Sequence, residues 1–349
     1  MSALRRVAAA VAVTALVAGC ERPPVDVVQT GFRGLGLEYV ENPRTLEDSV
    51  AALEARLPSV TPPPAALGDL PPAAPGTYEN VQVLGHLSEA EFTLTMNALV
   101  QWVAPEEGCN YCHVVAADSV NYAADDIYTK IVARRMLQMV QDINVNWTRH
   151  VGEEKGVNCW TCHQGQPVPS NYWFYTDENQ PLRYYLDRDD ARVQGPYALT
   201  SQGPNRQSIK QTEWTYAVMI NMSNALGVNC TYCHNSARFA DWDESSPQRV
   251  TALRGGRMIR DANMEYMVSL QGVWPQSVDD YAGYPDRPRL GPMGDGPKLQ
   301  CSTCHIGAYK PQYSHPASWG VGWNALTELG RPHDAAGSSD DAAMEGGGG

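Results

Sequence analysis

Four short stretches of the chain each contain two cysteines separated by two residues, with a histidine directly after the second cysteine. Two thiols at this spacing can form thioether bonds to the two vinyl groups of one haem, and the adjacent histidine can bind the iron as proximal ligand. One such motif could instead be a redox dithiol, and structural zinc would need paired motifs at shorter, regular separations. The motifs therefore predict four covalently bound c-type haems, held by Cys109, Cys112 and His113, by Cys159, Cys162 and His163, by Cys230, Cys233 and His234, and by Cys301, Cys304 and His305.

An iron that only transfers electrons needs a ligand on its second face, whereas an open face would indicate ligand binding or catalysis. Met96 lies 17 residues before His113, and Met219 lies 15 residues before His234. A helix that carries such a methionine could lie over the haem while the following turn returns the chain to the proximal side. Most methionines pack in cores, but the repeated arrangement favours three of them as distal ligands: Met96, Met136 and Met219. The nearest alternatives are Met139 and Met222.

The residues alone leave two candidates for the second ligand of the fourth iron. Met258 lies in a segment similar to the one around Met136, and His150 stands near the end of a predicted helix. Met136 and His150 are 14 residues apart, which is about 21 Å along a helix. They cannot bind one iron, but they could bind two neighbouring irons. A histidine at a helix C-terminus is also favoured by the helix dipole alone, so Met258 and His150 both stay open.

The haem motifs belong to an internal repeat in which an apolar, methionine-containing segment precedes each motif. This repeat predicts a mainly α fold, a multihaem c-type cytochrome with two pseudo-symmetric halves and long irregular loops. The halves cover residues 77–165 and 210–313, and each contains two haem-binding helix–turn–motif units. Residues 166–209 connect them. This connecting segment is rich in Pro, Gly and Tyr without clear periodicity, and we expect irregular structure or short strands there.

Two helices of the first half can be placed from local signals. Ser88 and Glu91 have the spacing of a capping box, which predicts a helix that begins after Ser88 and ends near Ala104–Pro105. A second helix is predicted from Asp125 to Arg149, because its apolar residues recur at helical spacing.

Residues 1–19 have the pattern of a bacterial lipoprotein signal peptide. Arg5 and Arg6 form a charged start, and Val7 to Val17 is an apolar stretch too short for an ordinary transmembrane helix. Small residues then lead to Cys20, which we expect to carry the lipid. Two or three acyl chains would anchor the protein firmly. No later stretch of the sequence is apolar enough to span a bilayer, so we expect the protein outside the cytoplasmic membrane.

The two ends of the mature chain differ from its core in composition. Residues 20–76 are rich in Pro and Ala and predict an extended, lipid-anchored arm with one short helix from Arg44 to Arg56. Residues 314–349 end in a small, acidic and Gly-rich run and predict a flexible tail.

The cysteine count and the net charge exclude some kinds of bond and partner. There are nine cysteines: Cys20 and the eight of the motifs, so none is left for a disulfide. The formal net charge is −13. Nucleic acid is excluded as a partner, because phosphate binding needs a basic face. An acidic surface favours a basic protein partner instead.

Segments beyond the haem motifs indicate a family. The chain resembles the tetrahaem cytochrome c subunit of bacterial photosynthetic reaction centres over nearly the whole mature sequence. The lipidated cysteine also fits this family. The resemblance rests on long and specific segments: Thr30–Gly34, Val83–Gly85, Val132–Leu137, Asn146–His150, Pro247–Arg249 and Arg257–Asp261, and it extends to about Pro311.

The resemblance implies a ligand for each iron. Three haems of the family have His/Met ligation and one has His/His ligation. This makes Met258 a packing residue beside the fourth haem. The implied pairs are Met96 with His113, Met136 with His163, Met219 with His234, and His150 with His305.

The resemblance also implies the task. The family re-reduces the photo-oxidised special pair of bacteriochlorophylls, at the periplasmic face of the photosynthetic inner membrane, and is an electron carrier and not an enzyme. The donor is a soluble cytochrome c or a high-potential iron–sulfur protein, and the haem on His234 lies nearest the special pair. Met ligation raises the potential relative to His/His. A multihaem reductase with an open iron and a free electron-shuttling lipoprotein are the alternatives.

Overall fold

A computed structural model of the chain describes residues 26–29, 38–41, 71–116, 119–152, 156–187, 210–239, 241–277, 288–311 and 323–327. The predicted signal peptide, the predicted lipidation site Cys20, the predicted Arg44–Arg56 helix and most of the predicted tail lie outside these residues. The described part is mainly helical with long irregular connections, as the sequence predicts. Within it, no helix has the length and apolar character needed to cross a membrane.

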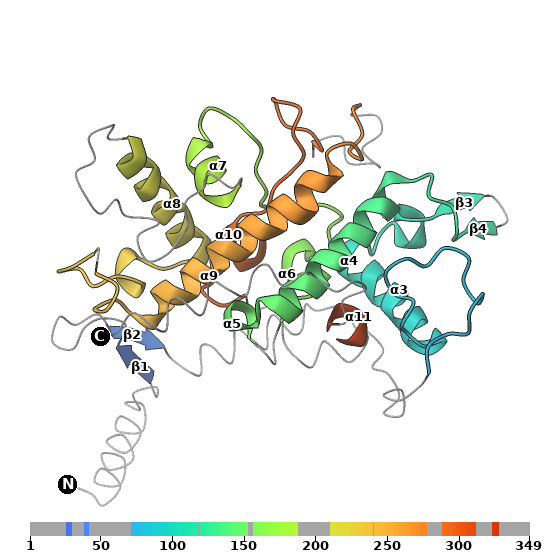
Figure 1. Ribbon diagram of the computed structural model, residues 1–349, viewed down its shortest axis with the longest axis horizontal. Coiled ribbons are helices and arrows are strands. Elements are labelled where there is room, and N and C mark those ends of the chain that lie inside the picture. Colours follow the sequence, from blue (N-terminus) through green and yellow to red (C-terminus); the bar gives the residue numbers. More distant parts are fainter. Residues whose placement is uncertain are drawn as a thin grey trace, which may run out of the picture.

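Two long helices run side by side through the middle of the molecule (Figure 1). They are α4 (Tyr128–Asn146) and α9 (Pro247–Ala262). α9 continues into one π-helical turn, Asn263–Met267, and a short 3-10 turn, Val268–Leu270. Apolar side chains from both helices form the centre of the core, among them Leu137, Val140, Ile143, Leu253, Met258 and Ile259.

Shorter elements lie at the two ends of this helix pair (Figure 1). One end has α3 (Glu89–Val103), the 3-10 turn η2 (Gly108–Tyr111) and the antiparallel pair β3 (Val114–Ala116) and β4 (Ser119–Asn121). The other end has α7 (Gln180–Leu186), α8 (Lys210–Leu226) and the 3-10 turn η3 (Cys230–Tyr232). Between the ends lie α5 (Thr148–Val151), α6 (Cys159–His163) and α10 (Cys301–His305).

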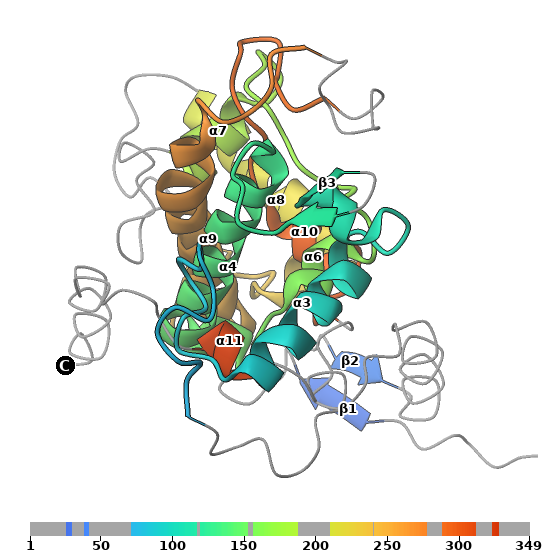
Figure 2. The same ribbon diagram turned by 90° about the vertical axis from the view of Figure 1, so that its right-hand side faces the viewer.

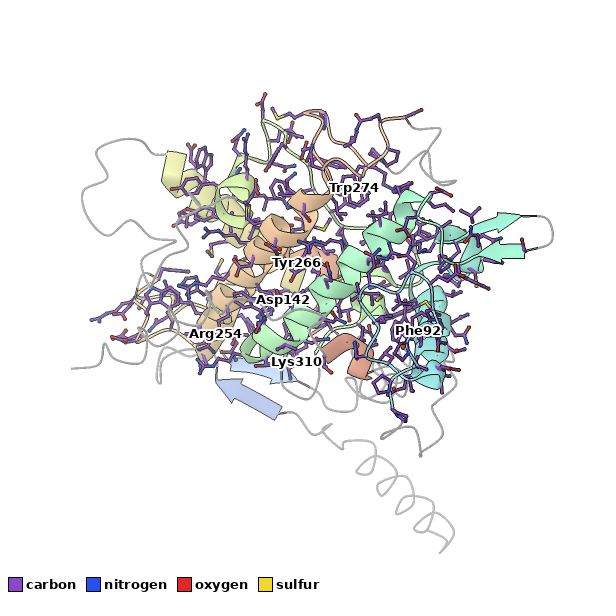
Figure 3. All side chains as sticks on the ribbon, turned by 45° about the vertical axis from the view of Figure 1, so that its right-hand side comes forward. Phe92, Asp142, Arg254, Tyr266, Trp274 and Lys310 are labelled. Atoms are coloured by element: carbon purple, nitrogen blue, oxygen red, sulfur yellow. A yellow bond between two sulfur atoms is a disulfide. The ribbon has the colours of Figure 1, made fainter. Side chains whose placement is uncertain are left out.

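Helix α3 begins and ends where the sequence predicts. The Ser88 side chain accepts from the backbone N–H of Glu91, and the Glu91 carboxylate accepts from the backbone N–H of Ser88 at 3.1 Å. This closes the predicted capping box. Phe92 on the same helix stacks on Tyr78 with ring centres 4.3 Å apart, in the region labelled in Figure 3. Viewed from this end, α11 (Trp323–Thr327) packs between α3 and α4 (Figure 2).

The second predicted helix is shorter than expected and is broken near its end. α4 begins at Tyr128, because Asp125 is used outside the helix as an acceptor for Lys130 at 3.1 Å and Arg134 at 2.9 Å. Hydrogen bonds from the Arg134 and Asn80 side chains hold the pKa of Asp125 well below its usual value. Trp147 leaves helical geometry, and the last turn becomes α5, which packs against α9.

The expectation of irregular structure or short strands in the connecting segment is wrong for part of it. Residues 180–186 form helix α7, and Leu182, Tyr185 and Leu186 are buried. Packing of this apolar face against α8 and α9 stabilises the helix, although the segment lacks a clear periodic signal of its own. In the predicted arm, β1 (Asp26–Gln29) and β2 (Glu38–Glu41) form an antiparallel pair that the sequence did not indicate.

Candidate haem-binding sites

The second and fourth motifs have the same local structure. Each forms a one-turn helix, α6 or α10, that begins at its first cysteine. Asn158 caps α6 through the backbone of Thr161, and Thr161 bonds back to the backbone of Asn158. On α10 the backbone N–H of Gln300 donates to the Thr303 hydroxyl at 3.0 Å, as that of Asn158 does to Thr161. These hydrogen bonds fix the direction of each one-turn helix, and with it the direction of its cysteines and histidine.

The chain then turns sharply after each of these two histidines. Gln164 and Ile306 both adopt the left-handed region, with φ of 53° and 45°. This conformation is uncommon for residues other than glycine. The glycine that follows each turn donates to a helix of a neighbouring motif: Gly165 to the carbonyl of Trp102 on α3 at 3.0 Å, and Gly307 to the carbonyl of Ala225 on α8 at 2.8 Å.

The first and third motifs form 3-10 turns that hydroxyl groups hold in place. Thr129 at the start of α4 donates its Oγ1 to the carbonyl of Tyr111, inside the first motif. Ser246, which precedes α9, donates its Oγ to the carbonyl of Tyr232, inside the third motif, at 2.6 Å. Each turn is therefore tied to the start of a long central helix.

Two buried asparagines tie the central helices to the residues before the second and fourth motifs. Asn144 on α4 donates to the carbonyl of Val157 at 2.8 Å and accepts from its N–H at 2.6 Å. Asn263, directly after α9, makes the same two bonds with Leu299, at 3.0 and 2.7 Å. Val157 and Leu299 each lie two residues before the first cysteine of a motif.

Removal of one of these amides should destabilise the protein strongly. The change Asn144→Ala leaves the buried N–H and carbonyl of Val157 without partners, so we expect a loss of about 2–4 kcal/mol in the free energy of unfolding. Asn146→Ala on the same helix removes only an exposed side chain that bonds Asp142, and we expect a much smaller loss there. Denaturant unfolding of the purified holoprotein compares the two; equal losses would contradict this role for Asn144.

Hydrogen bonds orient most of the predicted proximal histidines so that one ring nitrogen is free to bind a metal. Nδ1 of His163 lies 2.9 Å from the carbonyl of Gln166, and Nδ1 of His234 lies 2.8 Å from the carbonyl of Phe239. Nδ1 of His305 lies 2.9 Å from the carbonyl of Ala308. A backbone carbonyl at Nδ1 fixes the tautomer that leaves Nε2 free for a metal. His113 differs, because its Nδ1 makes no hydrogen bond of normal geometry, although the Tyr122 backbone lies close enough to favour the protonated ring.

Burial keeps these rings in the neutral form that binds metal. The pKa of His305 is lowered to about 4, first by burial and also by the nearby His150. Burial likewise lowers the pKa of the four other histidines singled out by the sequence, His113, His150, His163 and His234.

The structure brings His150 and His305 together. Their ring centres are 6.1 Å apart, and their planes are inclined by 68°. A metal-bound imidazole nitrogen lies about 2 Å from the metal and its ring centre about 1 Å further, so two rings on opposite faces of one iron are roughly 6 Å apart. Nδ1 of His150 lies 2.9 Å from the Thr251 carbonyl, so its Nε2 is also free. This pair fits a haem iron between the two rings.

An apolar cavity joins the predicted ligands of the second haem. Met136, Cys159, Cys162 and His163 all line it. Met139, the alternative to Met136, lines it as well. The rest of its wall is mostly aliphatic and aromatic, and includes Leu99, Val103, Tyr128, Val132, Leu137, Val140, Val168, Tyr172 and Trp274. These residues fit the attachment of a large apolar ring.

The other candidate methionines lie on helices α3, α8 and α9. Met96 on α3 and Met219 on α8 are partly buried, on the helices that lead into the first and third motifs. Met222 faces α9, since its Cε lies 3.8 Å from the position of a Cβ at Gly256. Met258 is only 6% exposed and belongs to the central core.

The structure contains one feature that the sequence analysis excluded. Cys162 and Cys304 form a disulfide, with Cα atoms 4.6 Å apart, while the other six motif cysteines are free. The expectation that no cysteine is left for a disulfide is therefore wrong for this pair, because the turns of α6 and α10 bring the two residues face to face. A sulfur in a disulfide cannot also form a thioether, so haem attachment at these motifs requires both thiols in the reduced form.

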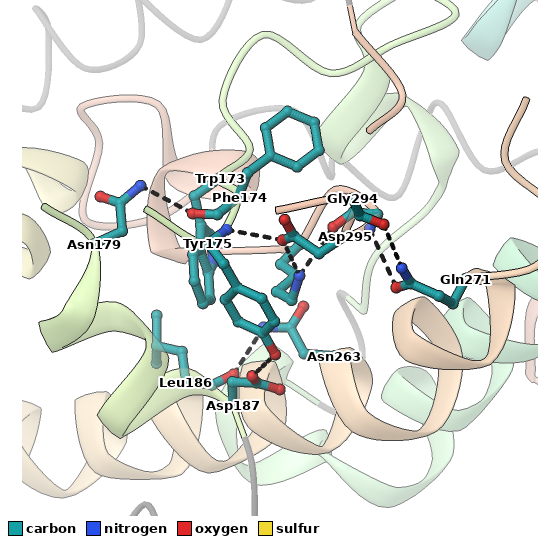
Figure 4. A network of polar contacts seen from close by, with 12 residues as sticks. Trp173, Phe174, Tyr175, Asn179, Leu186, Asp187, Asn263, Gln271, Gly294 and Asp295 are labelled. Carbon is teal, nitrogen blue, oxygen red and sulfur yellow. Dashed lines mark hydrogen bonds and ion pairs between the residues drawn. The ribbon is translucent and has the colours of Figure 1, made fainter. Parts of the chain in front are cut away.

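A buried polar network supports the start of the fourth motif (Figure 4). Lys298 is 3% exposed and Asp295 6%, and their charged groups are 2.6 Å apart. Asp295 also accepts from the backbone N–H of Tyr175 at 2.8 Å, and the Lys298 ammonium lies 3.7 Å from the centre of the Tyr175 ring. Burial lowers the pKa of Lys298, while Asp295 acts against this shift. Tyr175 in turn donates its hydroxyl to Asp187.

This network also fixes the position of the residue before Gln300. Trp173 pairs with Lys298 through two backbone hydrogen bonds of 3.1 and 2.9 Å, and its indole N–H donates to the Leu299 carbonyl at 2.8 Å. These residues could not be singled out from the sequence. The spacing of Asp295 and Lys298 and the aromatic run Trp173–Tyr175 were the available signals, but nothing local connects segments that are more than a hundred residues apart.

Comparison with known proteins identifies the family. The sequence profile described as the photosynthetic reaction centre cytochrome C subunit matches residues 21–183 and 176–317. This chain belongs to that family. The photosynthetic reaction center cytochrome c subunit of Rubrivivax gelatinosus is 45% identical over 332 residues, which cover 87% of this chain and 84% of that protein. The subunits of Thermochromatium tepidum and Roseobacter denitrificans are 40% and 38% identical, over 87% and 81% of this chain and 76% and 81% of theirs.

Membership of the reaction centre cytochrome c family has direct consequences. The chain is an electron carrier in photosynthesis and not an enzyme, and c-type haem bound to its cysteines is the redox group. The motifs and the neutral, oriented histidines described above fit this chemistry.

Proposed function

We propose that this chain holds four c-type haems and transfers electrons from a soluble periplasmic donor to the photo-oxidised special pair of a reaction centre. The observation that carries this proposal is the set of four Cys-x-x-Cys-His motifs. In three of them the histidine Nδ1 meets a backbone carbonyl and leaves Nε2 free. When bound, the haems supply one-electron transfer, and the protein supplies attachment, orientation and surroundings.

The four proposed sites have one ligand on each face. Cys109 and Cys112 attach the first haem, Cys159 and Cys162 the second, Cys230 and Cys233 the third, and Cys301 and Cys304 the fourth. The axial pairs are Met96 with His113, Met136 with His163, Met219 with His234, and His150 with His305. The shared cavity of Met136 and His163 and the 6.1 Å between the rings of His150 and His305 support two of these pairs.

The two-half organisation belongs to the same proposal. Residues 77–165 and 210–313 form the two dihaem halves, residues 166–209 connect them, and residues 314–349 form a flexible tail. The matching roles of Asn144 and Asn263, and of Thr129 and Ser246, support the repeat.

The contacts between motifs support an order for the sites. The second and fourth motifs are neighbours, since α6 and α10 pack together. Gly165 links the second motif to α3 and so to the first, and Gly307 links the fourth to α8 and so to the third. We infer the order first, second, fourth, third, with the site of His234 at the end that faces the special pair.

The chain's own side chains set the conditions for transfer. The mostly apolar wall around Met136 and His163 lowers the polarity of the surroundings, and burial keeps His163 neutral. Methionine at three sites raises the potential there relative to the His150–His305 site.

The N-terminal sequence supports a proposal for the location. We propose that residues 1–19 are removed, that Cys20 carries the lipid, and that residues 20–76 act as the arm of a protein held at the periplasmic face of the inner membrane. The sequence from Leu16 to Cys20 supports this. Mass measurement of the mature N-terminal peptide tests it; an unmodified Cys20 would exclude the lipid anchor.

Reduction by the donor should depend on salt. The donor is a soluble cytochrome c or a high-potential iron–sulfur protein, and the net charge of −13 favours a basic one. We expect the second-order rate of reduction to fall several-fold from 10 mM to 0.5 M salt, because salt screens surface charges. Stopped-flow reduction of the purified protein measures this; a rate independent of salt would exclude the acidic surface as the docking site.

A redox titration followed by low-temperature absorption spectroscopy tests the function. We expect four components, three with His/Met spectra and one with a His/His spectrum at the lowest potential, and no spectral shift when carbon monoxide is added to the reduced protein. Binding of carbon monoxide would instead indicate a multihaem enzyme with an open iron. Co-purification with bacteriochlorophyll-binding subunits separates the proposed function from a free shuttle.

A further inference from the structure

Helix α9 contains two adjacent glycines in its middle, Gly255 and Gly256, and both are buried. A glycine inside a helix costs about 0.5–1 kcal/mol relative to alanine, so a glycine at such a position calls for a packing reason. A Cβ at Gly255 would lie 2.4 Å from Cε1 and 2.8 Å from Nε2 of His150. A Cβ at Gly256 would meet only Cε of Met222, at an ordinary 3.8 Å.

The imidazole of His150 therefore lies directly against bare backbone. Its Nδ1 lies 2.9 Å from the carbonyl of Thr251. Thr251 precedes Gly255 by four residues, which is one helical turn. The same turn of α9 thus supplies the hydrogen bond that orients the ring and the open space that the ring fills. The packing of α5 against α9 brings His150 to this turn.

The equivalent position on α4 carries a side chain. Asn144 and Asn263 make the same contacts before the second and fourth motifs. Counting eight residues back from each asparagine leads to Met136 on α4 and to Gly255 on α9. α4 therefore presents a methionine to the second site at the position where α9 presents no side chain to the fourth.

We propose that Gly255 is a positioning residue that determines His/His ligation at the fourth site. The absence of a side chain on this turn of α9 admits the ring of His150, brought in from α5, to the face opposite His305. Met258, three residues later, stays in the core. This inference rests on the proposed ligation of the fourth haem by His150 and His305.

The test compares Gly255→Ala with Gly256→Ala in the full-length protein purified with its haems. Both changes add one methyl group to the same helix, and both should favour the helix by a similar amount. We expect Gly255→Ala to displace His150, so that one iron per molecule becomes five-coordinate. One carbon monoxide should then bind per molecule, and the lowest-potential component of the redox titration should be lost. Gly256→Ala should keep the spectra and the titration of the unmodified protein, and haem content by mass should be unchanged in both variants.

A double-mutant comparison covers the case in which Gly255→Ala lowers the yield of folded protein. In a His150→Ala background the ring is gone, so the added methyl group should no longer reduce yield or thermal stability. An equal loss in both backgrounds would overturn the inference, as would a Gly255→Ala protein indistinguishable from Gly256→Ala. If the unmodified protein already binds carbon monoxide or lacks a His/His spectrum, the proposed ligation fails and the inference falls with it.

Discussion

Replacement of Met219 by histidine should lower the midpoint potential of the third haem by on the order of 0.1 V or more, because a His/His pair stabilises the oxidised iron relative to His/Met. Met219 stands on α8, which leads into the motif of His234. At ambient potentials between the old and new midpoints, this site is oxidised before a flash and has no electron to give. The fast phase of re-reduction of the special pair should then be lost. Redox titration and flash absorption of the same membranes measure both effects.

Met222 provides the control for this change. It lies one turn further along α8, but its Cε points at Gly256 on α9. Met222→Leu should leave the four midpoints and the flash kinetics unchanged, whereas Met219→Leu should open one iron to carbon monoxide. An unchanged titration after Met219→His, or an open iron after Met222→Leu, would contradict the assignment of Met219.

Replacement of Asp295 by alanine should lower the free energy of unfolding by up to about 3–5 kcal/mol, because the buried ammonium of Lys298 loses its ion-pair partner and keeps only the Gly296 carbonyl, the Tyr175 ring and the more distant charge of Asp187. The two charged groups are 2.6 Å apart and nearly inaccessible to water. The burial that lowers the pKa of Lys298 is no longer opposed by Asp295 in this variant. The penalty should be full at neutral pH and should shrink as the pH rises through the lowered pKa toward 10.5, the usual value for lysine. Denaturant unfolding between pH 7 and pH 10 measures the loss and its pH dependence.

A double variant separates the charge from the space it occupies. Asp295→Leu combined with Lys298→Met removes both charges and keeps similar volume, so it should cost much less than Asp295→Ala alone. Some loss should remain, since Tyr175 loses an acceptor for its backbone N–H. If the double variant is as unstable as the single one, the unpaired ammonium is not the cause.

The motifs proposed as haem sites can be recognised from local sequence alone. The attachment residues follow from the spacing of cysteine and histidine, which one turn of chain provides in each motif. Helix α3 was also predictable, because its capping box and apolar stripe are complete within its own residues. In these parts the interactions that fix the structure lie close together in the sequence.

The distal ligand proposed for the fourth haem cannot be predicted from the residues in the same way. The resemblance between the segments around Met136 and Met258 favours Met258, but the long-range contacts of Asn144 and Asn263 align Met136 with Gly255. The alignment of α4 with α9 is therefore fixed by backbone partners outside the two helices. An alignment based on similar side chains, which matches Met136 with Met258, differs from it by three residues.

The break between α4 and α5 and the presence of α7 have the same origin. Neither Trp147 nor its neighbours give a local signal for a break, and the segment of α7 has no clear periodicity. The contacts of α5 with α9 and of α7 with α8 determine both. The Asp295–Lys298 network likewise depends on Tyr175, which comes from the connecting segment.

Peptide mapping of the mature holoprotein by mass spectrometry tests the central claim most directly. We predict four haem-bearing peptides, one for each Cys-x-x-Cys-His motif, and no peptide pair linked through Cys162 and Cys304. A mature protein with fewer than four haem-bearing peptides, or with the Cys162–Cys304 disulfide retained, would contradict the account.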